Sequence, residues 1–129
     1  MPRRSKDLLK RYLEARRRAL SERPAVLKEF LEKLASALGD KASIMVFGGR
    51  AVHGIETTEP RDLDILVVVE DGEDPSTVEE LAYSLKPKTL PVDIIVARKR
   101  ELKSPVVREM LRHRVVVHDP LNAESLLSS

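Results

Sequence analysis

The sequence contains no cysteine and no long apolar run. Without cysteine, the 129-residue chain can form no disulfide and offers no thiolate ligand to a metal. No stretch approaches the roughly 20 apolar residues that span a bilayer. The start, MPRRSKDLL, is not followed by the apolar segment of a secretory signal. We therefore expect a cytoplasmic protein without a membrane partner, and the length favours one domain.

Charge is abundant but lacks a dominant sign. The chain has 23 Lys and Arg against 21 Asp and Glu, so its net charge predicts no partner. Residues 1–23 nevertheless hold nine basic and three acidic residues, which leaves the rest mildly acidic. This basic stretch is interpreted as a solvated helix face, as a surface for a partner subunit or homo-oligomer, or as a contact to nucleic-acid phosphates. Nucleic acid is not favoured, because Tyr12 is the one stacking ring in this segment and no recognised DNA-binding module surrounds it.

Hydrophobic periodicity predicts an α/β (α+β) fold, with helices flanking a small mixed sheet of three to four strands. We expect one domain over residues 1–129, made of N-terminal helices (1–39), a core (43–118) and a polar tail (119–129). The predicted strands are 43–47, 62–70, 91–97 and 114–118. The predicted helices are 5–21, 24–38, 76–85, 98–102 and 104–113, with Pro24 starting the second of them.

Three acidic residues stand where buried strands should carry no charge. Asp62 and Asp64 open the apolar run 65–69 and, being two residues apart, share one face of an extended strand. Asp93 lies near the start of the next strand. If the first two strands are antiparallel and the third lies beside the second, all three carboxylates reach the same rim. Hard oxygen ligands of this kind select Mg²⁺ or Mn²⁺.

A glycine pair ends the first predicted strand and lies beside this rim. Gly48 and Gly49 have no side chains, so their backbone can approach a phosphate closely, and the predicted helix that follows would point its N–H groups at the anion. Arg50 could add a charged donor. Such a site suits attack on the α-phosphorus of a nucleoside triphosphate, with pyrophosphate leaving. Asp93 is then the best-placed group to accept the proton of the attacking hydroxyl.

Together these residues resemble the DNA polymerase β-like nucleotidyltransferase superfamily, and in particular its minimal nucleotidyltransferases. That pattern is a hydrophobic strand, Gly-Gly or Gly-Ser, about ten residues, Asp-hydrophobic-Asp, and a third acid on a later strand. Here Gly48-Gly49, Asp62-Leu63-Asp64 and Asp93 match it in order, within Phe47–Ala97. The resemblance implies that the acids hold Mg²⁺ and that the glycines receive the triphosphate, with ATP the expected donor. It also implies a helical HEPN-type protein partner in a toxin–antitoxin pair.

The chain departs from that pattern at three places. Gly49 replaces a frequent serine, His53-Gly54 stands where Arg-Gly is usual, and Arg61 precedes the first acid in place of serine. These changes bear on rate and substrate choice more than on the fold. The alternative function is a non-catalytic nucleotide-binding or antitoxin subunit.

Each candidate group also has a structural interpretation. The two acids of the Asp62-Leu63-Asp64 motif could cap a strand or pair with Arg61 and Arg98, and Asp93 could be structural. The glycine pair could form a plain tight turn. The three histidines are scattered along the sequence, and none is expected to bind a metal.

Overall fold

The computed structural model describes residues 2–48, 63–88 and 90–128, and the side chains of all of these except 2–7 and 13–24. The elements, in chain order, are α1 (Pro2–Leu38), η1 (Gly39–Lys41), β1 (Ala42–Phe47), β2 (Leu63–Val69), α3 (Pro75–Leu85), β3 (Val92–Arg98), η2 (Lys99–Lys103), α4 (Pro105–Met110), β4 (Arg114–His118) and α5 (Ala123–Ser128).

Four strands form one mixed sheet in the order β3-β2-β1-β4. Strand β1 pairs antiparallel with both β2 and β4, whereas β2 and β3 run parallel. Helix α3 connects the parallel pair, because two parallel strands need a crossover that returns the chain to the starting edge. The prediction of a small mixed sheet flanked by helices is confirmed, and the strand bounds agree with the predicted ones to within one residue.

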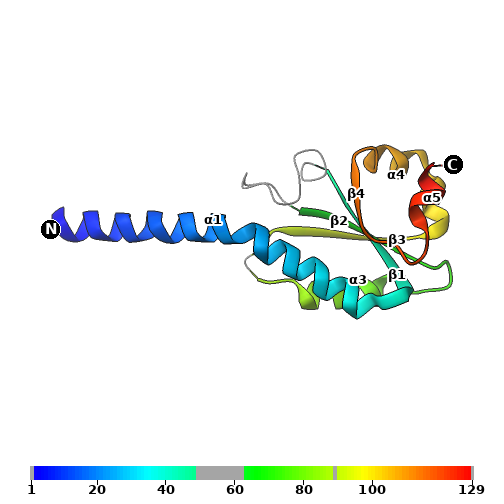
Figure 1. Ribbon diagram of the computed structural model, residues 1–129, viewed down its shortest axis with the longest axis horizontal. Coiled ribbons are helices and arrows are strands. Elements are labelled where there is room, and N and C mark those ends of the chain that lie inside the picture. The colour runs from blue at the N-terminus through cyan, green and yellow to red at the C-terminus, as the bar shows by residue number, and fades with distance from the viewer. Residues whose placement is uncertain (1, 49–62, 89, 129) are drawn as a thin grey trace.

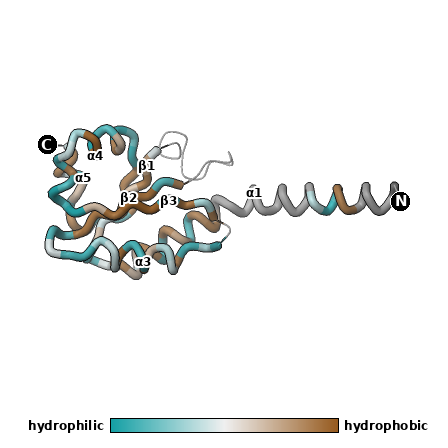
Figure 2. The backbone as a smooth tube through the Cα atoms, turned by 180° about the vertical axis from the view of Figure 1, so that it is seen from behind, coloured by the Kyte–Doolittle hydropathy of each residue, from teal (hydrophilic) through white to brown (hydrophobic). Residues whose placement is uncertain are grey.

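The strands are largely hydrophobic along their length (brown in Figure 2), and their apolar side chains pack on both faces of the sheet. One face packs against α1 and α3 through a cluster that includes Leu27, Phe30, Leu34 and Ile65. The other face packs against η2, α4 and α5. The protein therefore has three layers, with α1 and α3 on one side of the sheet and the C-terminal helices on the other (Figure 1). Two covered faces explain why β2 is almost entirely apolar.

The predicted break between two N-terminal helices is wrong, because α1 is one continuous helix of 37 residues. Pro24 lies inside it, where its missing N–H removes one backbone hydrogen bond and usually bends the axis. Packing of Leu27, Phe30, Leu31 and Leu34 on the sheet stabilises the C-terminal half. The N-terminal half projects away from the sheet (Figure 1). In the described part of the chain, no helix combines the length and hydropathy of a membrane span.

The short C-terminal elements differ from the predictions in type and extent. The segment predicted as helix 98–102 is the 3-10 helix η2, and α4 covers only Pro105–Met110 of the predicted 104–113. The polar tail forms the helical turn of α5. Asp119 caps this helix by accepting hydrogen bonds from the backbone N–H groups of Ala123, at 2.7 Å, and Glu124, at 3.1 Å.

Candidate functional site

Asp64 and Asp93 lie next to each other across the parallel β2–β3 pair. They are register partners, and register partners on neighbouring strands project from the same face of the sheet. Asp64 is half-buried and Asp93 is exposed. Both lie near the N-terminal ends of their strands, on the face that η2, α4 and α5 cover only in part. The fold therefore brings together two like charges, and a cation bound between them would offset their repulsion.

Gly48 is in contact distance of the Asp64 carboxylate. Its φ of +73° is left-handed, and a Cβ added there would collide with Oδ2 of Asp64. The neighbouring residue Phe47 is the register partner of Asp64 in the antiparallel β1–β2 pair. A side chain at residue 48 would displace the carboxylate, so glycine is required here by backbone conformation and by space. The structure thus places Gly48 against Asp64, the second acid of the Asp62-Leu63-Asp64 motif.

Other predicted site residues lie outside the described part of the chain. Gly49, Arg50 and Asp62 belong to the segment 49–62, as does His53. Within the described residues, no three His, Cys, Asp or Glu side chains are grouped closely enough to hold a metal ion. The described portion of the site therefore consists of Gly48, Asp64 and Asp93.

Two apolar residues that the sequence analysis did not assign to the site lie beside the acids. Phe47, opposite Asp64, is 8% exposed, whereas Ile95, two residues after Asp93 on the same strand face, is 42% exposed. The period-two alternation of a strand was the signal that could have identified Ile95. Ile95 therefore places an open apolar surface next to the Asp93 carboxylate.

The structure separates Asp64 from Arg98, one of the alternative partners that the sequence suggests for it. Arg98 is the register partner of Val69, at the opposite end of the β2–β3 pair from Asp64. Its Nε donates instead to the backbone oxygen of Glu73, at 3.2 Å. Arg98 therefore contacts the turn before α3 and lies away from Asp64, whereas Arg61 and Asp62 are outside the described residues.

His118 has a structural position at the end of β4. Its Nε2 donates to the carbonyl oxygen of Gly39, at 2.7 Å, and so joins the end of β4 to the residue that follows α1. His113 is exposed on the surface.

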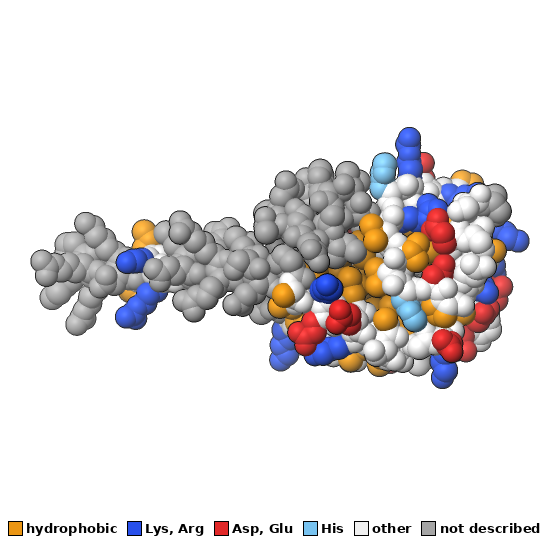
Figure 3. Space-filling model, in the orientation of Figure 1, with side chains coloured by type: hydrophobic (Ala, Val, Ile, Leu, Met, Phe, Trp, Pro, Cys, Tyr) orange, Lys and Arg blue, Asp and Glu red, His pale blue; other side chains and the backbone are white. Residues whose placement is uncertain are grey.

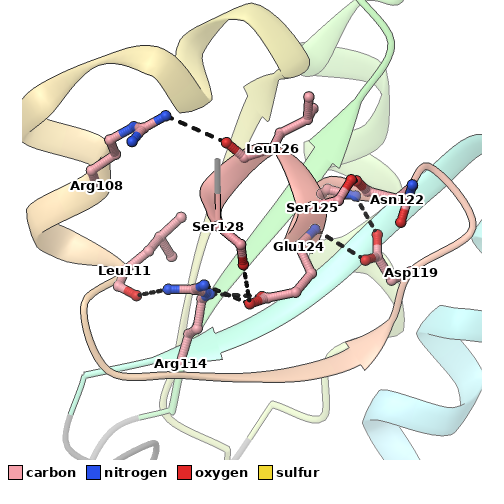
Figure 4. A network of polar contacts seen from close by, with 10 residues as sticks. Arg108, Leu111, Arg114, Asp119, Asn122, Glu124, Ser125, Leu126 and Ser128 are labelled. Atoms are coloured by element: carbon pink, nitrogen blue, oxygen red, sulfur yellow. Dashed lines mark hydrogen bonds and ion pairs between the residues drawn. The ribbon is translucent and has the colours of Figure 1, made fainter.

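A polar network joins β4 to α5 (Figure 4), and its Arg114 is the register partner of Phe47, in the same row of the sheet as Asp64. The Arg114 guanidinium donates to both carboxylate oxygens of Glu124, at 2.7 and 2.5 Å. These hydrogen bonds raise the pKa of Arg114 and, from the other side, lower the pKa of Glu124. Nearby, the fully buried Ser43 donates to Asp119 at 2.7 Å and accepts the N–H of Leu121 at 3.1 Å. Each group has a structural partner, so the network ties the C-terminal helix to the sheet.

Comparisons with known proteins support the fold. No family model matches the chain, and no curated protein sequence matches it. A crystal structure of a protein from Sulfolobus solfataricus, described as a nucleotidyltransferase, superposes with a TM-score of 0.52 at 20% identity. That alignment covers 77% of this chain and 82% of the other. A toxin–antitoxin structure with AMP-PNP has a TM-score of 0.50 at 20% identity, covering 78% and 79% of the two chains. The four-stranded mixed sheet of this protein, with its flanking helices, is thus the nucleotidyltransferase fold.

Proposed function

We propose that this chain is a Mg²⁺-dependent nucleotidyltransferase that transfers a nucleoside monophosphate, AMP from ATP as the expected case, to a hydroxyl acceptor. The observation that carries the proposal is the register pairing of Asp64 with Asp93 beside the bare backbone of Gly48. Two adjacent carboxylates at the starts of these strands contribute nothing to apolar packing. Phosphoryl transfer needs them to hold a cation next to the phosphates.

The donor set fits magnesium. Asp64 and Asp93 supply hard carboxylate oxygens from one strand face, and Asp62, two residues before Asp64 in the sequence, would supply a third. Manganese suits the same oxygens. When bound, the metal would neutralise negative charge on the triphosphate and on the departing pyrophosphate.

The chain's own residues have distinct proposed roles. The backbone around Gly48, with Gly49 and Arg50 following it in the sequence, receives the triphosphate. Asp93, the more exposed acid, accepts the proton of the acceptor hydroxyl. The hydroxyl oxygen forms a bond to the α-phosphorus while the bond from that phosphorus to the bridging oxygen of pyrophosphate breaks. Ile95 offers an apolar surface beside this reaction for the acceptor or the nucleoside.

The toxin–antitoxin neighbour favours a second candidate function. That structure contains AMP-PNP, so a chain of this fold occurs in a toxin–antitoxin structure together with an adenine nucleotide analogue. Under this alternative, the present chain binds ATP and covers a HEPN-type partner protein, without catalysis. A catalytic version would use the partner as its hydroxyl acceptor.

The experiment compares ATP labelled on the α-phosphate with ATP labelled on the γ-phosphate. Nucleotidyl transfer moves only the α-label to an acceptor and releases the γ-label in pyrophosphate. Asp64→Asn and Asp93→Asn should each lower the rate by about 10²-fold or more, since each removes a charge needed in the transition state. Asp40→Asn is the matched control, because Asp40 is an exposed carboxylate in η1, near the end of β2 opposite to Asp64.

The outcomes separate the two candidates. Mg²⁺-dependent ATP binding without transfer of the α-label, with and without candidate partner proteins, would favour the non-catalytic subunit. Transfer that survives both Asp→Asn substitutions unchanged would contradict the proposed site. Absence of ATP binding by calorimetry would rule out both functions.

A further inference from the structure

The two edge strands of the sheet, β3 and β4, differ in the contacts that they make with the rest of the described chain. Strand β3 forms one edge, and there the Tyr83 hydroxyl of α3 accepts the N–H of Ile94 at 3.3 Å and donates to its C=O at 3.5 Å. An unpaired strand edge is a template for pairing with another chain, and such contacts obstruct it. Edge pairing is therefore disfavoured at β3.

Strand β4 forms the other edge, and no described side chain forms a hydrogen bond to the backbone of its central residues. Its central residues Val115–Val117 include no charge, proline or glycine, and Val116 is 37% exposed. In the part of the chain that the structure describes, the backbone hydrogen bonds of these three residues lead only to β1. A short apolar edge of this kind is suited to receive another strand.

An apolar groove lies between β4 and the sheet-packed half of α1. It has a volume of about 370 Å³ and is lined by Leu31, Ala35 and Val115–Val117, with Lys28 and Glu32 at its rim. Apolar side chains are visible between α1 and β4 on the face shown in Figure 3. The groove and the open strand edge are contiguous, because the same three valines belong to both.

We propose that β4 and this groove bind a second copy of the chain, by antiparallel β4–β4 pairing about a twofold axis. A twofold interface uses the same patch twice, so the patch must complement itself. Lys28 and Glu32 meet this condition, because they are exposed, opposite in charge and one helical turn apart on α1. Two antiparallel α1 helices place Lys28 of one copy near Glu32 of the other.

The distribution of charge along the chain also supports a second copy of the chain as the binding partner. Residues 1–23 carry nine of the 23 basic and three of the 21 acidic residues, so the remainder has 14 basic and 18 acidic. Helix α1 extends this basic segment beyond the body of its own copy (Figure 1). When two α1 helices run antiparallel, the basic half of each passes alongside the acidic body of the other. The exposed Leu8, Leu9 and Tyr12 of that half then gain a neighbouring surface.

The test uses the full chain in sedimentation equilibrium and native mass spectrometry. The wild type is expected to dimerise at micromolar concentrations, and Val116→Lys to be monomeric, because a lysine at the strand edge opposes pairing. Lys28→Glu and Glu32→Lys each place like charges at the rim and should weaken the dimer roughly tenfold. Mixed together, these two variants should form a heterodimer in preference to either homodimer, since the opposite charges then face each other.

The matched controls are Glu29→Lys and Lys33→Glu. These residues form an exposed salt bridge of 3.0 Å on α1 and do not line the groove, so the same charge changes should leave the dimer intact. A wild type that stays monomeric up to about 0.5 mM would overturn the proposal. So would a dimer that is unaffected by Val116→Lys, or mixed charge variants that show no preference for the heterodimer. Circular dichroism establishes that each variant is folded.

Discussion

Asp64 on β2 and Asp93 on β3 are register partners on the same face of the sheet, and Asp64 also lies against the backbone of Gly48. Placing two carboxylates side by side costs stability unless a cation or a hydrogen bond compensates for their repulsion. This arrangement is the physical basis of the proposed site, and it predicts how the protein should respond to metal and to substitution.

Magnesium should stabilise the folded protein through these two acids. At a free concentration ten times the dissociation constant, one bound ion adds about 1.4 kcal/mol to the free energy of unfolding. Asp64→Asn and Asp93→Asn should each diminish this gain, and without metal Asp93→Asn should be at least as stable as the wild type, because it removes the repulsion with Asp64. Thermal denaturation with and without Mg²⁺ measures both effects. An equal gain in Asp64→Asn, Asp93→Asn and the control Asp40→Asn would show that the ion binds elsewhere.

Gly48→Ala should destabilise the protein more than Gly39→Ala. Both glycines have positive φ, +73° and +54°, so alanine costs about 1–2 kcal/mol at either position. At Gly39 the added Cβ meets nothing within 4 Å, whereas at Gly48 it collides with the Asp64 carboxylate. The excess loss in urea denaturation therefore measures the collision. Equal losses in the two variants would indicate that the carboxylate moves away without cost.

Removal of the Tyr83 hydroxyl should expose the β3 edge. Tyr83→Phe keeps the ring but loses both hydrogen bonds to Ile94, which we expect to lower the free energy of unfolding by about 1 kcal/mol. The freed edge should also raise the aggregation rate on heating, as followed by light scattering. Tyr12→Phe removes an exposed hydroxyl from the projecting half of α1 and serves as the control. Indistinguishable behaviour of the two variants would refute a protective role for Tyr83.

Acid should weaken the attachment of α5 through Glu124 and Asp119. Hydrogen bonds from Arg114 lower the pKa of Glu124 below its ordinary 4.5. Burial opposes ionisation of Asp119, but the hydrogen bonds from Ser43 and the α5 backbone outweigh it and lower its pKa below 3.8. A lowered carboxyl pKa stabilises the folded state above the ordinary value, and this contribution disappears as the pH falls through the folded-state pKa.

The corresponding measurement is the free energy of unfolding between pH 6 and pH 2. Wild-type stability should fall below about pH 4.5, and Glu124→Gln should show a shallower fall, because glutamine does not titrate. Glu109→Gln is the control, since Glu109 is an exposed residue whose contact with Arg112 is a long surface pair of 3.8 Å. Identical acid profiles for wild type and Glu124→Gln would contradict the assigned contribution.

Much of the fold follows from local patterns in the sequence. The continuously apolar run after Asp64 predicts a central strand because a strand covered on both faces excludes polar residues, and β2 has that position. The candidate site residues Asp64 and Asp93 are recognisable for the same reason, as acids at the starts of apolar strands. The proposed roles of Gly49, Arg50 and Asp62 come from the sequence pattern alone.

Local patterns were less informative where the structure depends on distant contacts. Pro24 predicts a helix start by its own chemistry, yet α1 continues through it, and Leu27, Phe30 and Leu34 anchor the following half on the sheet. The short α4 and the 3-10 form of η2 likewise differ from their helical periodicity, since brief elements are stabilised mainly by packing.

The sequence by itself determined which segments become strands and which acids interrupt them, because alternation and apolar runs are properties of neighbouring residues. Only the tertiary structure decided that β4 pairs with the free edge of β1, that Tyr83 forms hydrogen bonds with the edge strand β3, and that Ser43 contacts Asp119 across 76 residues of chain. Those relationships depend on which surfaces remain to be buried once the strands have paired, and that is a property of the assembled sheet and its helices.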